Sequence, residues 1–399
     1  MIRVGFEFVL DDEWQGGINY FRNLLTALYD LPGRSIEAVV FTGRRAPERH
    51  FDGFPPVEIV RTSMVDTGTP AWFVRKVWHR ATSRDGLLES LLGQHRIDVL
   101  SHSGWLGRNS NIPAIGWIQD FQHLHLPGNF SAAEVASRNK AFRNLCRHCA
   151  KIILSSHNAR ADLAGFAPEC AARSEVLQFV AMPSKVPGTQ LSRDELERQY
   201  AFSGRYFLLP NQFWKHKNHR VVIDALAATR SQGERILVLA TGSPHDYRHP
   251  GHFDALMAYA GERGVRDSFR YLGMVPGAHL AALMKHACAI VNPSLFEGWS
   301  TTVEEAKSLG KRVLLSDIAV HREQAPELAD YFAPDDPLAL ADLFRRLAAA
   351  NPEDDPRARE KARQTTERRR LEFAQRFQEI VLDTFAGAGR APRDRGTCR

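Results

Sequence analysis

The residues with the clearest potential for chemistry lie in the stretch Val291–Gly310. Glu297 and Gly298 occupy a predicted loop, between a buried strand that ends near Asn292 and a helix that begins near Thr302. Free amides at a helix start, together with the positive end of the helix dipole, bind phosphate groups. Glycine lets a ligand approach the backbone closely, and carboxylates accept hydrogen bonds from hydroxyl groups. The stretch therefore predicts a site for a phosphorylated sugar.

Glu305 has two candidate roles. It follows Glu297 with seven residues between them, and we place it in the first helical turn. One of these acids can bind sugar hydroxyls and the other ribose hydroxyls. Alternatively, Thr302 and Glu305 form a capping box, in which Glu305 accepts from the Thr302 amide, and Glu297 is an ordinary loop acid. The residues alone favour the cap for Glu305.

A second polar turn, Leu208–His219, opens the second half of the chain between a predicted strand and a helix. Its polar side chains include Asn211, Gln212, Lys215 and Lys217. Lysine is a compact cation that suits a pyrophosphate group. The turn therefore predicts phosphate binding, with a solvated basic loop as the alternative.

Two further turns follow predicted strands in the first half. Gly16 and Gly17 would allow a tight turn and a close approach to an anion, although they lack the GxGxxG spacing of dinucleotide sites. A purely structural turn is the alternative. Asp120 and His123 follow another predicted strand. Asp120 is the better candidate for a pocket residue, since His123 could equally serve packing.

The framework for these turns is a series of short apolar runs that alternate with amphipathic helical stretches. This alternation is typical of parallel sheets covered by helices. The predicted strands are Ile2–Val9, Glu37–Thr42, Val57–Arg61, Asp98–Ser101, Pro113–Ile118, Lys151–Ser155, Glu175–Gln178, Tyr206–Leu209, Ile236–Thr241, Arg270–Leu272, Ala287–Asn292 and Lys311–Ser316. The predicted helices include one that starts near Ile18 and others at Asn218–Thr229, Phe253–Arg263, Ala278–His286, Thr302–Leu309, Pro337–Ala350 and Pro356–Ala386.

A chain of 399 residues suits two domains of roughly 150–200 residues each. We expect an α/β fold of two Rossmann-like, doubly wound parallel-sheet domains facing a cleft, over residues 1–185 and 192–355. Residues 181–191 carry two prolines and a glycine and predict a linker. Residues 387–399 predict a disordered basic tail. Because ligands bind beyond the carboxyl ends of such strands, we expect the polar turns to meet at the cleft.

The composition is that of a globular protein, with 44% hydrophobic and 25% charged residues. No apolar stretch approaches the ~20 residues of a membrane span, and the start lacks the features of a signal peptide. We therefore expect a cytoplasmic protein. Cys146 and Cys149 resemble half of a zinc site, but no second pair follows them, so we expect no metal.

The formal charge of +6 favours anionic partners. No zinc-finger spacing or aromatic RNA-binding signature is present, so we expect no nucleic-acid partner. Trp72–Arg80 interleaves aromatic and cationic residues on a predicted helix, and such segments can lie in a membrane interface. An apolar face buried in the core, opposite a solvated face, is the favoured alternative for this segment.

The two acids resemble a known signature. Glu297 and Glu305, flanked by Pro293-Ser294 and by Ala306 to Gly310, look like the E-x7-E motif of retaining glycosyltransferases of family 4, which have the GT-B fold. The resemblance implies that Glu297 faces the donor sugar and Glu305 holds the ribose. It also implies that the backbone after Glu297 meets the diphosphate.

The resemblance extends to other turns of the chain. At the Leu208–His219 turn the family has an arginine followed five residues later by a lysine. Lys217 matches that lysine, but Gln212 stands in place of the arginine, which Lys215 or His216 would have to replace. The glycine turn resembles the family's phosphate loop.

Two more segments complete the likeness. The family has His-Asp where this chain has Gln119-Asp120, and Ser316–Glu323 resembles a loop beneath the donor, with helix capping as the alternative. A last helix near 366–386 that packs back onto the first domain is also implied.

The implied activity is retaining transfer of a sugar from a nucleotide-diphosphate sugar, without a metal or other cofactor, to a glycan or lipid-linked acceptor in surface polysaccharide synthesis. Peripheral contact with the inner face of the membrane fits such an acceptor. The implied catalytic residues are Glu297, Lys217, Asp120 and His123; the implied donor-binding residues are Gly16, Gly17, Asn211, Gln212, Lys215, Lys217, Gly298, Trp299, Ser300, Thr301, Thr302 and Glu305. The alternatives are a nucleotide-dependent oxidoreductase or epimerase, and a non-catalytic basic protein that binds membrane surfaces.

Overall fold

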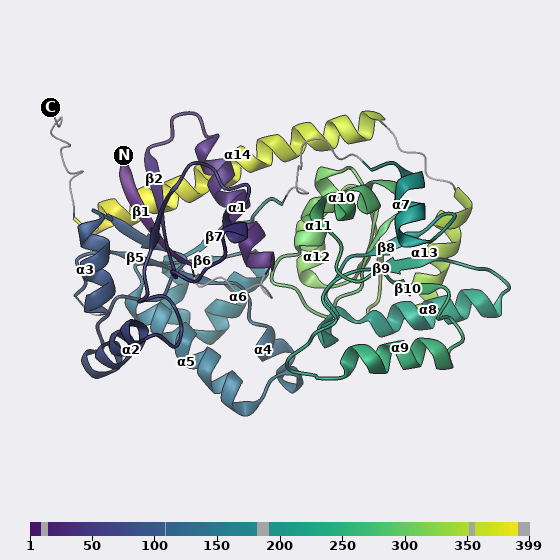
Figure 1. The fold of residues 1–399 in the computed structure, drawn as a ribbon, viewed down its shortest axis with the longest axis horizontal. Helices are drawn as coiled ribbons and strands as arrows, with labels where there is room; N and C mark the ends of the chain where they lie inside the picture. The colour runs from purple at the N-terminus through teal and green to yellow at the C-terminus, as the bar shows by residue number, and fades with distance from the viewer. Residues whose placement is uncertain (9–14, 108, 182–190, 351–355, 390–399) are drawn as a thin grey trace. The chain divides into compact units, whose positions relative to one another are not determined.

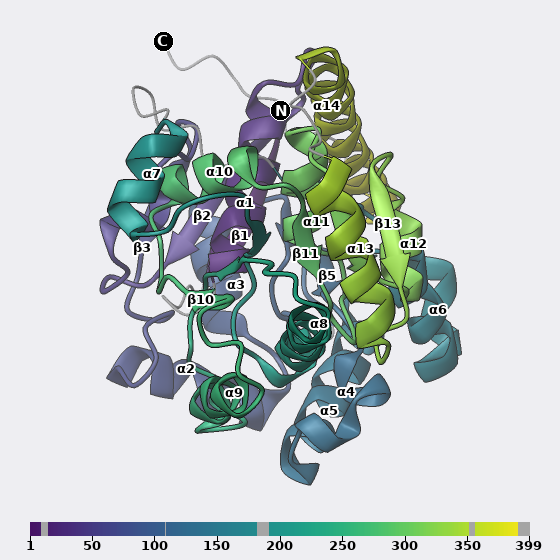
Figure 2. The same cartoon turned by 90° about the vertical axis from the view of Figure 1, so that its right-hand side faces the viewer.

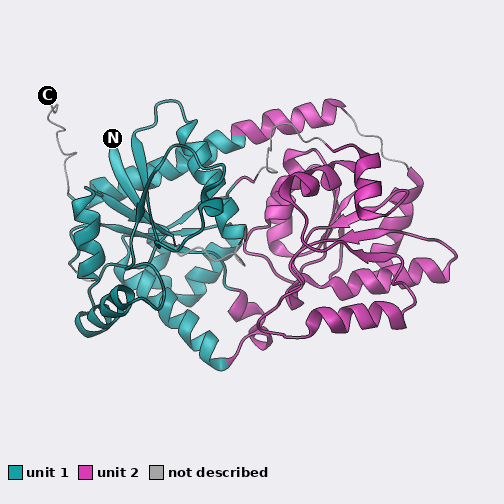
Figure 3. Cartoon of the chain, viewed as in Figure 1, with its two compact units in different colours: residues 1–121, 132–179, 369–399 teal, residues 122–131, 180–368 magenta. Residues whose placement is uncertain are grey.

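The computed structural model describes residues 1–8, 15–107, 109–181, 191–350 and 356–389. The chain divides into two compact units (Figure 3). Unit 1 comprises residues 1–121, 132–179 and 369–399, and unit 2 comprises residues 122–131 and 180–368. Most of the expected linker, and the expected tail beyond residue 389, lie outside the described residues.

Unit 1 is built on a parallel sheet of seven strands in the order β3-β2-β1-β4-β5-β6-β7 (Figure 1). Its strands are β1 (Ile2–Phe8), β2 (Ile36–Thr42), β3 (Glu58–Arg61), β4 (Val99–Ser101), β5 (Ala114–Ile118), β6 (Lys151–Leu154) and β7 (Ser174–Val176). In register, Val4 of β1 lies between Ala38 of β2 and Val99 of β4. The strand order therefore reverses between β1 and β4.

Helices surround this sheet and bury its apolar side chains. They are α1 (Gln15–Tyr29), α2 (Pro70–Thr82), α3 (Gly86–Gln94), α5 (Ala132–His148) and α6 (His157–Phe166), with 3-10 turns at Glu48–Phe51 and Pro168–Arg173. The second part of α14 (Pro356–Gly387) also belongs to unit 1. Its Phe377 ring lies 5.9 Å from the ring of Phe6, and the Gln378 side chain accepts a hydrogen bond of 2.7 Å from the amide of Ser35.

Unit 2 contains a parallel sheet of six strands in the order β10-β9-β8-β11-β12-β13. Its strands are β8 (Phe207–Leu209), β9 (Val238–Ala240), β10 (Phe269–Tyr271), β11 (Ile290–Asn292), β12 (Val313–Ser316) and β13 (Ala329–Phe332). β13 was not predicted from the sequence. It is an edge strand that pairs only with β12, and three of its four residues are partly exposed, so it lacks the apolar run of a buried strand.

The helices of unit 2 cover the sheet on both faces, as Figure 2 shows in a second view. They are α4 (Gln122–His125), α7 (Arg193–Tyr200), α8 (His219–Ser231), α9 (His252–Glu262), α10 (Gly277–His286), α11 (Thr301–Ser308), α12 (Ala319–Gln324), α13 (Pro337–Ala350) and the first part of α14, with 3-10 turns at Pro127–Asn129 and Lys215–Lys217. The predicted α/β fold with two parallel sheets is therefore confirmed. None of the described helices is both long enough and apolar enough to cross a membrane.

Candidate active site

Two turns from distant parts of the sequence meet at the carboxyl edge of the unit 2 sheet. β8 and β11 are adjacent strands, and the strand order reverses between them. Lys217 follows β8 and Glu297 follows β11, and the Lys217 Nζ lies 2.6 Å from Glu297 Oε1. Such a reversal point is where ligands bind in open α/β sheets. The side chains are only 19% and 9% exposed, so the pair is largely shielded from water.

A buried network of short polar side chains fixes the geometry around this pair. Asn292, the last residue of β11, accepts a hydrogen bond of 3.0 Å from Asn211 and donates one of 2.8 Å to Ser300. The Thr302 hydroxyl donates to Asn211 Oδ1 at 3.3 Å. The Ser294 hydroxyl lies 2.7 Å from Asn292 Oδ1 and 2.7 Å from Glu297 Oε1. The network joins the ends of β8 and β11 to the start of α11.

The turn that carries Lys217 is also bonded directly to the Glu297 loop. The Leu295 amide donates to the His216 carbonyl at 2.8 Å, and the Asn218 side chain donates to the Pro293 carbonyl at 3.2 Å. Behind the turn lies Gly242, where an added Cβ would stand 2.5 Å from the Asn211 carbonyl oxygen. A glycine is therefore required there to let the Asn211–Gln212 backbone occupy its place.

The cap of α11 differs from the sequence prediction. Ser300, not Thr302, is the N-cap: its hydroxyl accepts from the Val303 amide at 3.4 Å, and its carbonyl accepts from the Glu304 amide at 3.2 Å. The Thr302 hydroxyl is instead engaged by Asn211. Glu305 is the fifth residue of the helix, too far along it to cap its start. The capping-box interpretation of Glu305 is therefore wrong.

The start of α11 has two amides available for an anion. The Ser300 amide donates to Gln324 Oε1 at 3.1 Å and the Val303 amide to the cap. The amides of Thr301 and Thr302 have no hydrogen-bond partner in the part of the chain that the structure describes. Trp299, two residues before Thr301, is buried. Two such amides at the positive end of a helix favour a phosphate group.

The two acids of the site differ in their ionisation. Burial alone would raise the pKa of Glu297, but the nearby charge and hydrogen bond of Lys217 lower it to about 2. Burial raises the pKa of Glu305 to about 7. Glu297 is therefore a full carboxylate at neutral pH, whereas Glu305 is divided between its acid and its carboxylate.

The imidazoles beside this pair carry no charge at neutral pH. Burial, with the charge of Lys217, lowers the pKa of His216 to about 3. Burial also lowers the pKa of His321, whose Nδ1 lies 2.8 Å from the Ser316 carbonyl oxygen. His216 therefore cannot replace a missing arginine as a cation. Lys215 is exposed, and its amide donates to Asp246 at 3.1 Å.

The remaining expected site residues lie elsewhere in the chain. Gly16 and Gly17 lie in the first turn of α1 in unit 1, and an added Cβ at Gly16 would meet no atom within 4 Å. Asp120 belongs to unit 1 and pairs with Arg138 at 3.1 Å. His123 is buried and belongs to unit 2 with the rest of segment 122–131.

That segment lies close to the Glu297 loop. The ring of its His125 is 5.1 Å from the ring of Phe296, the residue before Glu297. Gln122 accepts a hydrogen bond of 3.1 Å from Arg248, which lies between β9 and α9. Segment 122–131 therefore supplies part of the surroundings of the unit 2 site.

Unit 1 has its own cavity at the point where its strand order reverses. The cavity has a volume of about 460 Å³ and is lined by residues of β1 and β5 and by residues that follow β4, among them Glu7, Trp117, His102 and Trp105. Arg75 of α2 lies in its wall, where its guanidinium pairs with Glu7 and, at 2.8 Å, with Asp85. This triad was not predicted from the sequence.

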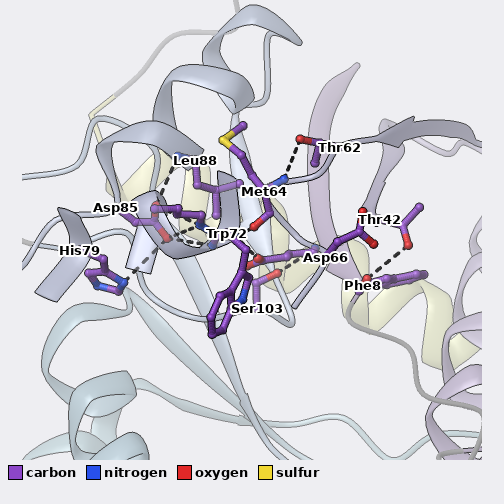
Figure 4. Close-up of polar contacts among 12 residues, drawn as sticks. Phe8, Thr42, Thr62, Met64, Asp66, Trp72, His79, Asp85, Leu88 and Ser103 are labelled. Carbon is purple, nitrogen blue, oxygen red and sulfur yellow. Dashed lines mark hydrogen bonds and ion pairs between the residues drawn. The ribbon is translucent and has the colours of Figure 1, made fainter. Parts of the chain in front are cut away.

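Polar contacts in the wall of the cavity centre on Asp85 (Figure 4). Asp85 also caps α3 by accepting from the Leu88 amide at 3.3 Å, and His79 Nδ1 lies 3.8 Å from Asp85. Burial lowers the pKa of His79, and that of His102 to about 3, so both rings are uncharged at neutral pH. Aromatic rings beside paired carboxylates suit a ligand with apolar faces and hydroxyl groups better than an anion.

Among the described residues, no group of three or more His, Cys, Asp or Glu side chains is placed to hold a metal ion. Cys146, Cys149 and Cys170 are buried as free thiols.

Comparison with known proteins agrees with this geometry. Residues 192–365 match the family model described as glycosyl transferases group 1. No curated protein sequence matches the chain.

Solved structures resemble the chain along almost its whole length. A glycosyltransferase from Rickettsia africae ESF-5 superimposes with a TM-score of 0.67 at 12% identity, covering 98% of this chain and 99% of its own. HepE of Anabaena in complex with UDP-glucose has a TM-score of 0.67 at 15% identity and coverages of 97% and 100%. The lipopolysaccharide outer core galactosyltransferase WaaB has a TM-score of 0.61 at 13% identity and coverages of 96% and 99%. The chain thus has the GT-B fold, and the family match supports a glycosyltransferase.

Proposed function

We propose that this protein is a retaining glycosyltransferase with the E-x7-E motif of family 4, which transfers a sugar from a nucleotide-diphosphate sugar to a glycan or lipid-linked acceptor. The observation that carries the proposal is the shielded Lys217–Glu297 pair beside the open amides of α11, at the reversal point of the unit 2 sheet. Positive groups and a fixed carboxylate at one place suit a diphosphate attached to a sugar.

The diphosphate would bind between Lys217 and the start of α11. The ammonium of Lys217 has three protons, and Glu297 Oε1 accepts one of them. The other two can contact phosphate oxygens, while the amides of Thr301 and Thr302 donate to the same group. Lys215 and Gln212 border this turn and complete the proposed contacts with the donor, together with Asn211, which positions Thr302.

The two acids would bind the sugar and the nucleoside. Glu297 is ionised and held by Lys217 and Ser294, so it can accept hydrogen bonds from donor-sugar hydroxyls. Glu305, one turn further along α11, would accept from the ribose hydroxyls. HepE, a protein of the same fold, binds UDP-glucose, which supports a nucleotide sugar as the donor in this chain.

In the proposed reaction, the bond between the anomeric carbon and the diphosphate oxygen breaks, and the electron pair leaves with the diphosphate. Lys217 and the α11 amides stabilise the charge that develops there, an effect of the same kind as an oxyanion hole. The acceptor oxygen bonds to the anomeric carbon on the face that the diphosphate leaves, so its proton can pass to a departing phosphate oxygen. The scheme invokes neither a protein nucleophile nor a metal.

The acceptor would occupy the unit 1 cavity, whose aromatic and paired polar wall suits a saccharide. Gly16 and Gly17 would lie near the donor phosphate, and Asp120 and His123 near the transferred sugar. WaaB acts on the outer core of lipopolysaccharide, which supports a role in surface polysaccharide synthesis. A cytoplasmic enzyme that contacts the inner face of the membrane is part of this proposal.

A panel of uridine, guanosine and deoxythymidine diphosphate sugars tests the proposal. We expect one of them to raise the Tm of the purified chain by mass action and to be consumed when a saccharide acceptor is added. Nuclear magnetic resonance of the product should show the donor's anomeric configuration. Inversion would refute the retaining mechanism, and the absence of both stabilisation and turnover across the panel would refute the function.

A further inference from the structure

α2 of unit 1 exposes an apolar face to solvent. Phe73, Val74, Val77 and Trp78 are 60%, 59%, 58% and 53% exposed. They stand at positions i, i+1, i+4 and i+5 of the helix and therefore share one side of it. These are four of the ten large hydrophobic side chains that are exposed in the described chain. The expectation that the apolar face of this segment is buried is therefore wrong.

Arg75 fixes the orientation of α2, in which the apolar face is turned to solvent. This residue is the buried one on the helix, and its guanidinium binds Asp85 through two nitrogens, at 2.9 and 2.8 Å, as well as Glu7. Removing one partner of a buried ion pair is strongly destabilising, because the other charge is left buried without a partner. The helix therefore cannot rotate to bury its apolar face without breaking this triad.

Cations surround the exposed face. α2 contains no acidic residue, and its Lys76 and Arg80 are exposed. Exposed Arg44 and Arg45 lie near its beginning, because their amides donate to Asp66 at 2.8 and 3.2 Å, and the Asp66 carbonyl accepts from Thr69, the N-cap of α2.

We propose that the α2 face, made of Phe73, Val74, Val77 and Trp78 with Lys76 and Arg80, docks on an anionic lipid bilayer. The apolar side chains enter the boundary between headgroups and acyl chains, with the indole of Trp78 at the level of the headgroups. Lys76 and Arg80 contact lipid phosphates. With 13 residues the helix is about 20 Å long, so it lies in the interface rather than across it.

Charge complementarity selects this occupant over a protein. Interfaces between proteins are depleted of lysine at their core, whereas an apolar face bordered by cations matches the negative surface of an anionic leaflet. Lys76 and His79 also line the unit 1 cavity, so the docking face and the cavity share a wall. The inference names the surface that would make the membrane contact included in the proposed function, and its test does not depend on the transfer reaction.

Co-sedimentation of the full-length protein with vesicles tests the proposal. One set of vesicles is phosphatidylcholine alone, and the other contains about one third phosphatidylglycerol. We expect binding only to the anionic vesicles, with Lys76→Gln/Arg80→Gln weakening it roughly 10- to 30-fold. Phe73→Ser/Trp78→Ser should weaken it at least ~10-fold. Leu338→Ser removes a 63% exposed leucine of unit 2 and is the matched control, which should bind normally.

Circular dichroism and the Tm without ligand establish that each variant is folded, independently of membrane binding and of the proposed transfer reaction. Equal binding to neutral vesicles, or undiminished binding of Phe73→Ser/Trp78→Ser, would overturn the proposal. A native chain that is dimeric by light scattering, with a monomeric Phe73→Ser/Trp78→Ser variant, would also overturn the proposal. A second copy of the chain would then cover the α2 face.

Discussion

At the scale of single residues, the central feature of unit 2 is a lysine held by a carboxylate. Lys217 and Glu297 form an ion pair that is largely shielded from water, and the charge of Lys217 lowers the pKa of the Glu297 carboxyl. In the proposed reaction both side chains act on the donor, so neither can be replaced without loss of turnover. The contribution of the pair to stability can be separated from its contribution to transfer by comparison with a second ion pair of the same unit that lies away from the donor site.

Lys217→Ala and Glu297→Gln should each lower kcat by roughly 10²- to 10³-fold, the cost of removing one group that stabilises developing charge. Arg312→Ala is the control, because it breaks a 2.8 Å pair with Asp330 in the same unit, away from the proposed donor site. Steady-state kinetics and Tm should show that the control loses stability without losing turnover. Near-normal turnover in both site variants would contradict the assignment.

Glu305 predicts a dependence of stability on pH. Burial raises its pKa from 4.5 to about 7, so the folded state binds the proton more tightly than the unfolded chain does. This stabilisation is fully present below pH 4.5 and is lost as the pH rises through about 7. The Tm of the native protein should therefore fall relative to that of Glu305→Gln between about pH 5 and about pH 8.

Glu297 provides the comparison for this measurement. Its pKa is lowered to about 2, so its stabilisation is present above pH 4.5 and is lost only as the pH falls through about 2. The difference in Tm between the native protein and Glu297→Gln should accordingly be constant over the same range. A Tm difference for Glu305→Gln that is also constant would show that the Glu305 carboxyl titrates normally.

At the scale of elements, the donor site depends on how α11 begins. Ser300 caps the helix and is itself oriented by Asn292, the last residue of β11. The cap determines where the helix begins, and therefore that the amides of Thr301 and Thr302 are the ones left for a phosphate group. Through Asn292, the cap connects the end of β11 to phosphate binding.

Ser300→Ala should cost about 1 kcal/mol of stability, as typical N-cap removals do, and should also raise the Kd for the sugar nucleotide. Ser192→Ala is the matched control, since Ser192 caps α7 of the same unit through a hydroxyl bond to the Glu195 amide of 3.3 Å. Chemical unfolding and donor titration should show similar losses of stability but a change in donor affinity for Ser300→Ala alone. Unchanged donor affinity in Ser300→Ala would show that the start of α11 does not bind the donor.

Most elements could be predicted from the sequence because buried parallel strands appear as continuous apolar runs. β13 was missed since an edge strand needs no such run. The prediction for α2 was wrong for a different reason. Apolar side chains on one side of a helix normally face the core, but here the ion pairs of Arg75 with Glu7 and Asp85 hold the opposite side of the helix against unit 1. Such a triad joins residues far apart in sequence, and no local spacing indicates it.

The donor turns could be anticipated because each directly follows a predicted strand, and strands of a parallel sheet end at one edge. The network that orders them could not. Asn292, Ser294 and Gln324 are common polar residues without characteristic spacing, and their partners are defined only once β8, β11 and α12 are packed together.

At the scale of the whole molecule, a donor should protect two segments in one unit. Hydrogen exchange of the full chain, with and without the stabilising sugar nucleotide, should slow in residues 208–219 and 291–310. These segments form the Lys217 turn and the Glu297 loop with α11. Protection confined to the neighbourhood of the unit 1 cavity would contradict the assignment of the donor to unit 2.

The last helix gives the order of synthesis a physical consequence. Phe377, Ile380 and Val381 of α14 are fully buried in unit 1, although most of that unit's sequence precedes residue 180. Each such side chain contributes about 1.5–3 kcal/mol when buried. Because this part of α14 follows unit 2 in the sequence, a nascent chain leaves the apolar surface that these side chains cover exposed in unit 1 until the residues beyond 368 have been synthesised.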